Sequence, residues 1–177
     1  KIIKMKETSK SSIGFDSSAL ALKIKQTIET LEHLKKQIDE VNSEIENHPI
    51  PRQSPLHKID GLNSIEIAYI MSAIINISRF DSIKKVVAYA GLDPVVRQSG
   101  TFMASKTRMS KRGNKMLRYA LIWAANNVRL HNKNLNTYYL KKRAQGKSHY
   151  NALGHCAVKL IRYIWFVLHN PDKEFIN

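Results

Sequence analysis

The stretch from Asn114 to His169 reads NKMLRYALIWAANNVRLHNKNLNTYYLKKRAQGKSHYNALGHCAVKLIRYIWFVLH. It predicts three consecutive helices, over 114–130, 135–145 and 148–169, because apolar residues recur at helical spacing and Gly146 separates the last two. The residues predicted to face inward in the first of these are Leu117, Leu121, Ala124, Ala125 and Val128. No segment has a convincing strand pattern, so the predicted fold class is all-α.

Two shorter helices are predicted before this stretch, one over 83–90 that Gly91 ends, and one that begins at Asn63 or Ser64. A turn at Gly61 and Asn63 precedes the latter and resembles a helix-hairpin-helix, in which backbone N–H groups face a phosphate. The usual hairpin has Gly at both positions, so an ordinary turn between two core helices explains the sequence equally well. Gly61 and Asn63 are therefore candidate nucleic-acid contacts with an alternative structural role.

Apolar residues repeat every seven residues between Leu20 and Ile45, with Thr27 as the one break. The two core positions of this heptad hold Ile24, Leu31, Ile38 and Ile45, and Leu20, Leu34 and Val41. So narrow a stripe favours a long coiled-coil-type helix that joins copies of the chain into a homo-oligomer. An amphipathic helix packed on its own domain is the alternative.

Prolines at 49, 51 and 55 follow this helix and predict a stiff linker. The predicted organisation is a lead-in and coiled-coil helix over 1–48, a Pro-rich linker over 49–55 and a compact helical domain over 56–177. The apolar fraction of the chain, 43%, is enough to build a core.

The charge of the chain is concentrated in its C-terminal half. Between Asp93 and Asp172 there is no acidic residue and there are fifteen Lys and Arg, whereas the rest of the chain holds fourteen basic and fourteen acidic residues. The net charge of +15 therefore comes from this stretch. A surface without counter-charges of its own binds anions from elsewhere, and nucleic-acid phosphate is the commonest source.

Other features bear on the location of the protein. No apolar run reaches the roughly 18 residues of a membrane span, and the start of the chain lacks both a secretory signal peptide and an initiator Met. Cys156 is the single cysteine and cannot form an internal disulfide. We expect no membrane partner, a reducing cytoplasmic location, and a chain that is a fragment of a longer protein.

The polar connection over 92–110 contains Ser99, Gly100 and several cations, and long loops in compact domains are usually functional. The Ser99 hydroxyl lies between Arg97 and the basic run that begins at Lys106, where it would meet a phosphodiester held by cations. Gly100 would allow a backbone to approach closely. Arg108 belongs to the same basic run.

Lys111, Arg112, Gly113 and Asn114 lie at the start of the 114–130 helix, where free N–H groups and the helix dipole favour phosphate. A serine needs activation to become a nucleophile, yet no carboxylate or metal-binding cluster lies near Ser99 in the sequence. The residues alone therefore favour a hydrogen-bonding role for this serine. They also predict that any metal comes from another segment or another chain.

Several short motifs occur in an order and spacing typical of one family. They are Ile59-Asp60-Gly61, Arg79-Phe80, Ala90-Gly91-Leu92-Asp93-Pro94, Gln98-Ser99-Gly100, Ser110-Lys111-Arg112-Gly113-Asn114, Leu117-Arg118 and Ala144-Gln145-Gly146-Lys147. Together they resemble the C-terminal domain of the insertion-sequence one-ten transposase family, which includes the Piv-type DNA invertases. The likeness covers nearly the whole chain.

The resemblance implies a RuvC-like domain outside this chain, with a DEDD set that holds Mg²⁺, joined to a coiled coil and a helical transposase domain. It implies that Ser99 is the serine that cleaves DNA, and that no metal ligand lies in this chain. It also implies dimers and tetramers, and a structured non-coding guide RNA, the bridge RNA, that selects target and donor DNA. The candidate nucleic-acid contacts are Arg97, Gly100, Lys106, Arg108, Lys111, Arg112, Gly113, Asn114, Arg118, Gly61 and Asn63.

The predicted function is the DNA-binding, serine-bearing part of a bacterial, nucleoid-associated transposase or site-specific recombinase. The whole protein would cleave and rejoin DNA by transesterification, and the fragment alone would be inactive. One alternative is a non-catalytic nucleic-acid-binding module. Another is an oligomerisation segment whose charge only keeps the chain in solution.

Overall fold

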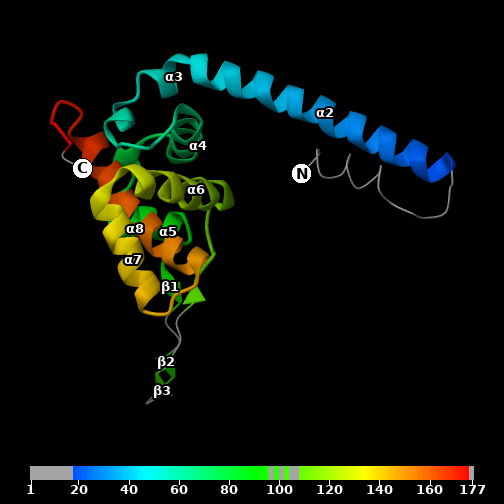
Figure 1. Ribbon diagram of the computed structural model, residues 1–177. Helices are drawn as coiled ribbons and strands as arrows, with labels where there is room; N and C mark the ends of the chain where they lie inside the picture. The colour runs from blue at the N-terminus through cyan, green and yellow to red at the C-terminus, as the bar shows by residue number, and fades with distance from the viewer. Residues whose placement is uncertain (1–17, 96–97, 100–101, 104–107, 176–177) are drawn as a thin grey trace. The chain divides into compact units, whose positions relative to one another are not determined.

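The computed structural model describes residues 18–95, 98–99, 102–103 and 108–175 (Figure 1). The chain forms two compact units, one that ends at Asn47 and one that begins at His48. Helices make up most of both units, so the predicted all-α fold class is confirmed.

The first unit contains α2, Ser18–Asn47, a helix of 30 residues that includes the whole predicted heptad segment. Its apolar side chains are exposed or half-buried: Leu34 is 47% exposed, and Ile38 and Val41 are each 58% exposed. The helix of the predicted coiled coil is therefore present, and an apolar stripe runs along it.

Two short helices occupy the segment predicted to be a stiff linker. They are α3, Pro49–Arg52, and the 3₁₀ helix η1, Pro55–Lys58, and each begins with a proline. Proline suits the first helical turn because the N–H that it lacks would have no helical partner there. Pro51 and Leu56 are buried, so this segment contributes to the core of the second unit.

The remaining helices of the second unit are α4, Ser64–Ile74; the 3₁₀ helix η2, Ile77–Arg79; α5, Ile83–Tyr89; α6, Lys115–His131; α7, Lys133–Ala144; and α8, His149–His169. α4 ends at Ile74 because Ile75, at φ +61°, leaves the helical conformation. α7 begins two residues before the predicted start, since the Asn132 side chain caps it with a bond of 2.7 Å from the Leu135 N–H.

The core lies around α6 and α8, which pack against each other (Figure 1). α4 packs on α6, α5 and η1 pack on α8, and α7 contacts both central helices. Ala124, Ala125 and Ala157 are fully buried, and such small side chains allow helices to approach closely. Cys156 is fully buried as well, which agrees with the role of a small core residue.

Four strands of two residues each lie between α5 and α6. β1, Pro94–Val95, pairs with β4, Arg108–Met109, and β2, Gln98–Ser99, pairs with β3, Phe102–Met103; both pairs are antiparallel. We call β1 to β4 the β ribbon. No periodicity in the sequence indicates these strands, because two residues are too few to show an alternating pattern.

Candidate nucleic-acid interface

The loop that leads into α6 is bonded to the segment that follows α5. The Gly91 carbonyl accepts a hydrogen bond of 3.0 Å from the Lys111 N–H, and the Asp93 carbonyl accepts one of 2.8 Å from the Ser110 N–H. The Ser110 hydroxyl also donates to the Asp93 carboxylate at 2.5 Å. These bonds fix the two ends of the β ribbon against each other.

Gly113 lies where no side chain fits. A Cβ at this position would be 2.3 Å from the Tyr89 carbonyl oxygen and 2.9 Å from the Gly91 nitrogen. The Asn114 N–H donates to the same Tyr89 carbonyl at 2.8 Å. Gly113 therefore permits the close approach of two backbone segments of this chain. This packing is sufficient to explain a glycine at position 113, and a nucleic-acid contact of Gly113 stays a prediction.

Asn114 and Arg118 are engaged within the chain. The Asn114 side chain accepts a bond of 3.0 Å from the Leu117 N–H, which caps α6, and its amide donates to the Tyr89 hydroxyl at 3.3 Å. Arg118 Nη1 donates to the Ala90 carbonyl at 3.0 Å. Both side chains therefore hold the start of α6 against the end of α5, and any contact with phosphate stays a prediction.

Three cations around the start of α6, Lys111, Arg112 and Lys115, are exposed. Lys111 has a φ of +55°, a conformation that residues other than glycine and asparagine seldom adopt. The positive φ and the bond to Gly91 turn the chain sharply just before the helix. The turn leaves the charges of Lys111 and Arg112 exposed and free to meet an anion.

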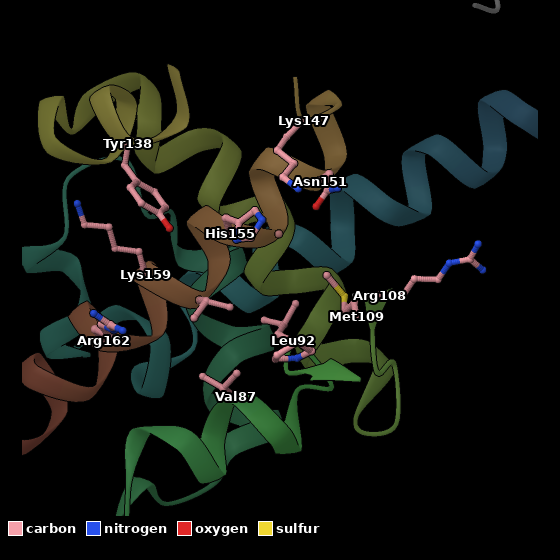
Figure 2. A pocket seen from close by; sticks show the side chains of 13 residues that line it. Val87, Leu92, Arg108, Met109, Tyr138, Lys147, Asn151, His155, Lys159 and Arg162 are labelled. Carbon is pink, nitrogen blue, oxygen red and sulfur yellow. The ribbon is translucent and has the colours of Figure 1, made fainter. Parts of the chain in front are cut away.

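A groove of about 470 Å³ lies between α8 and the ends of the β ribbon (Figure 2). Its apolar lining residues are Val87, Leu92, Pro94, Met109, Gly154 and Val158. Its polar lining residues are Arg108, Tyr138, Lys147, Asn151, His155, Lys159 and Arg162. None of these thirteen residues is acidic, so the groove favours an anion.

One of the cations in the groove, Lys159, has contacts that hold it in place. Lys159 Nζ donates to the Asn134 carbonyl at 3.4 Å and lies 5.2 Å from the centre of the Tyr138 ring. Arg108 extends from β4 and is exposed, and Figure 2 shows its guanidinium pointing away from the other side chains that line the groove. Arg108 is nonetheless the predicted nucleic-acid contact that the structure places in the lining of the groove.

His155 is half-buried and lines the same groove. Its pKa is lowered from the usual 6.5, first by burial and then by the positive charges of Lys142 and Lys147. The imidazole is therefore largely neutral near pH 7, when it offers one hydrogen-bond donor and one acceptor.

Ser99 lies at the end of β2, where it pairs with Phe102 of β3. The structure describes the backbone at Ser99 and not its side chain. Arg97, Gly100 and Lys106 lie outside the described residues. The nucleophilic role of Ser99 and the contacts of these three residues stay predictions.

Gly61 and Asn63 lie at a joint between α4 and α6. A Cβ on Gly61 would be 2.7 Å from the His131 ring and 3.0 Å from the Val128 Cα. The Asn63 side chain accepts a bond of 2.8 Å from the Glu66 N–H, and the Asn63 N–H donates to the Glu66 carboxylate at 3.2 Å. These contacts support the alternative that the sequence left open, an ordinary turn between two core helices. A phosphate contact of Gly61 or Asn63 stays a prediction.

Most of the groove was not recognised as a site from the sequence. Asn151, His155, Lys159 and Arg162 are spaced by four, four and three residues on α8, which places them on one face of the helix. That spacing is a signal that the sequence does contain. The opposite wall comes from Val87, Leu92 and Met109, and no local pattern predicts that they face α8.

In the described part of the chain, no group of three His, Cys, Asp or Glu side chains is arranged to hold a metal ion. Mg²⁺ was expected in a domain outside this chain, and that expectation stays a prediction. Among the described residues, none forms a helix that is both long and apolar enough to cross a membrane.

Comparison with known proteins gives the family. A model of the Transposase IS116/IS110/IS902 family matches residues 53–140. An insertion element IS110 uncharacterized 43.6 kDa protein of Streptomyces coelicolor is 28% identical over 130 residues, which are 73% of this chain and 31% of that protein. An insertion element IS116 uncharacterized 44.8 kDa protein of Streptomyces clavuligerus is 26% identical over 126 residues, 71% of this chain and 31% of the relative.

The chain thus covers 31% of the length of each of these relatives. The region matched by the family model, 53–140, contains the turn at Gly61, the β ribbon with Ser99, and α6. These are the segments whose motifs resemble the insertion-sequence one-ten transposases. The chain belongs to the IS116/IS110/IS902 family of transposases.

Proposed function

We propose that this chain is the nucleic-acid-binding, serine-bearing part of a transposase that cleaves and rejoins DNA. Ser99 is the proposed nucleophile, and the exposed cations around the start of α6 and in the groove bind the DNA backbone. The family supports a role in transposition. The serine chemistry is our own proposal.

One observation carries the proposal. β1 and β4 are paired, and both Pro94 of β1 and Arg108 of β4 line the acid-free groove. Ser99 lies between these strands in the chain, so the segment that carries the serine begins and ends at a cationic surface. A serine hydroxyl held near bound phosphodiester has the proximity that transesterification requires.

In the proposed step, Ser99 Oγ attacks a backbone phosphorus. A P–Oγ bond forms, a bond from phosphorus to one deoxyribose oxygen breaks, the serine proton passes to a base, and the departing oxygen gains a proton. Rejoining reverses these changes when a DNA hydroxyl attacks the phosphoserine. Mg²⁺ in a RuvC-like domain outside this chain would stabilise the charge that develops on the phosphate oxygens.

Two partners belong to the same proposal. A second copy of the chain pairs along the heptad stripe of α2, supported by the exposure of Leu34, Ile38 and Val41. A structured guide RNA supplies the choice of target and donor DNA, supported by the family resemblance and by a basic surface that suits any phosphodiester.

The test uses a full-length protein of which this chain is part, carrying Ser99→Ala. We expect loss of recombination and loss of the covalent protein–DNA adduct on denaturing gels, with DNA binding retained. Ser105→Ala, which removes another hydroxyl of the same segment, is the matched control and should retain both activities. Recombination that survives Ser99→Ala would favour the non-catalytic nucleic-acid-binding module.

A second test uses the 177-residue chain alone. We expect it to bind DNA and to leave the strands intact in the presence of Mg²⁺. Strand cleavage by the chain without any other protein would contradict the proposed division of labour.

A further inference from the structure

We propose that the groove between α8 and the β ribbon takes one unstacked nucleotide of a single strand, with its base on the apolar wall and its phosphates at the cationic rim. This inference rests on the proposed nucleic-acid function and adds the form of nucleic acid that the site accepts. A duplex, whose bases are stacked and paired, would contact only the rim.

The lining of the groove has two chemically distinct sides. Val87, Leu92 and Met109 present apolar surface, and the charged residues lie along α8 and at Arg108 (Figure 2). A phosphate ion alone would satisfy the cations and leave the apolar side in contact with water. A nucleotide matches both sides, because a base has apolar faces and its phosphates are anionic.

The size of the groove fits one nucleotide. Its volume of about 470 Å³ lies within the roughly 300–1,000 Å³ typical of small-ligand pockets. We take this volume as room for a single base with its sugar. The strand must therefore present a base that has left its stack, as in single-stranded regions.

Gly154 allows the Met109 side chain to approach α8 closely in the floor of the groove. It is buried within α8, where glycine costs roughly 0.5–1 kcal/mol of stability relative to alanine. A Cβ at this position would lie 2.9 Å from the Met109 methyl carbon. A side chain here would have to displace Met109, so this glycine lets Met109 pack against α8 as part of the apolar wall of the groove.

Asn151 and His155 lie one helical turn apart on the rim side of the groove. An amide and a neutral imidazole each offer a donor and an acceptor, which is what the edge of a base requires. Burial lowers the pKa of His155 and so keeps the ring neutral. Tyr138 adds an aromatic ring to the same side.

The cations stand where the flanking phosphates would lie. Arg108, Lys147 and Arg162 are exposed, and Lys159 is half-buried. Because they approach from β4, the loop after α7, and α8, they surround the groove instead of forming a single row. Such an arrangement suits the two phosphates that flank one nucleotide.

The experiment compares three fluorescein-labelled ligands by anisotropy with the 177-residue chain: decathymidylate, an abasic decamer with the same phosphates, and a ten-base-pair duplex. We expect the wild type to bind decathymidylate roughly tenfold more tightly than the abasic decamer, an effect at the lower end of base–aromatic stacking because the wall is mainly aliphatic. Equal affinity for these two ligands would overturn the inference and leave the proposed DNA binding intact. Failure to bind any of the three would contradict both proposals.

Gly154→Leu would displace Met109 and so fill the floor of the groove, and Ala144→Leu adds the same side chain at an exposed position outside it. We expect Gly154→Leu to abolish the preference for decathymidylate while the affinities for the abasic decamer and the duplex stay within twofold. Val158→Phe also adds bulk to the lining of the groove and serves if Gly154→Leu fails to fold. It should likewise abolish the preference for decathymidylate. An unchanged preference in a folded filling variant, or an equal loss for all three ligands, would overturn the inference.

Discussion

The Asn127 side-chain amide on α6 donates a hydrogen bond of 2.5 Å to the carboxylate of Glu66 on α4. Glu66 is fully buried, and the other carboxylate oxygen accepts the Asn63 N–H at 3.2 Å. Burial raises the pKa of Glu66, and the bonds from Asn63 and Asn127 oppose that rise. In the turn at Gly61 and Asn63, for which the sequence suggested phosphate binding, the Asn63 N–H thus donates to a carboxylate of the chain itself.

We predict that Glu66→Ala lowers the free energy of unfolding by about 2–4 kcal/mol, because the Asn63 and Asn127 donors lose their buried partner. Glu66→Gln keeps the shape and one acceptor, so it should cost about 1 kcal/mol or less. Urea denaturation at pH 7 measures both. An equal loss in the two variants would mean that packing, and not the hydrogen bonds of Glu66, stabilises the contact between α4 and α6.

The raised pKa of Glu66 also predicts that the free energy of unfolding depends on pH. Because the folded-state pKa lies above the usual 4.5, the stability that Glu66 contributes is fully present below pH 4.5 and is lost as pH rises through the folded pKa. The free energy of unfolding of the wild type minus that of Glu66→Gln should therefore fall as pH rises from 4.5. Urea denaturation of both proteins at a series of pH values tests this, and a difference that rises with pH would be contrary to it.

The close approach of Gly113 to Tyr89 predicts a severe effect of Gly113→Ala. The methyl group would meet the carbonyl oxygen at 2.3 Å, so the loop before α6 must move, at a cost of about 3 kcal/mol. Gly146→Ala is the matched control, because Gly146 also has positive φ, +76°, but nothing within 4 Å of the added Cβ. Its expected cost is about 1 kcal/mol, and thermal and urea unfolding of both variants separate the close contact from backbone strain.

The lowered pKa of His155 predicts that the free energy of unfolding decreases in mild acid. Its folded-state pKa lies below 6.5, so its contribution is fully present above pH 6.5 and is lost as pH falls through the folded pKa. Burial is the main cause, and the positive charges of Lys142 and Lys147 act in the same direction. The other charged residues that line the groove, Arg108, Lys159 and Arg162, are also cationic.

The measurement is the free energy of unfolding of the wild type minus that of His155→Gln, followed from pH 7.5 to pH 5 in roughly half-unit steps. The difference should decrease steadily below pH 6.5. A flat difference across this range would show that the imidazole is no harder to protonate in the folded chain than in the unfolded one.

The charges of the groove predict a change in the salt dependence of DNA binding. Lys147→Ala should reduce the slope of log K against log salt by about 1, as expected when one phosphate contact is lost. Lys25→Ala on α2 is the control: Lys25 lies 4.0 Å from Glu29 and is exposed. Fluorescence anisotropy between about 50 and 200 mM salt measures both slopes, and equal slopes in the two variants would exclude Lys147 as a phosphate contact.

The helices could be predicted because their signals are local. α6 and α8 carry apolar residues at helical spacing, and Asn114 and Ser148 cap them through side-chain bonds to the third residue beyond. The β ribbon could not be predicted, because its strands of two residues depend on pairing across the hairpin. The bond from Arg118 to the Ala90 carbonyl could not be predicted either, since only the folded chain brings that carbonyl near. A contact of Arg118 with phosphate stays a prediction.

The sequence by itself determined the excess of positive charge between Asp93 and Asp172, the positions of the helices and the family, because composition, periodicity and motif spacing are read along the chain. The tertiary structure decided which of the fifteen cations share one groove and which apolar residues form its wall. Met109 and Gly154 are 45 positions apart in the sequence, yet a Cβ on Gly154 would lie 2.9 Å from the Met109 methyl carbon. Contacts of that kind depend on long-range packing, for which neighbouring residues in the sequence carry no signal.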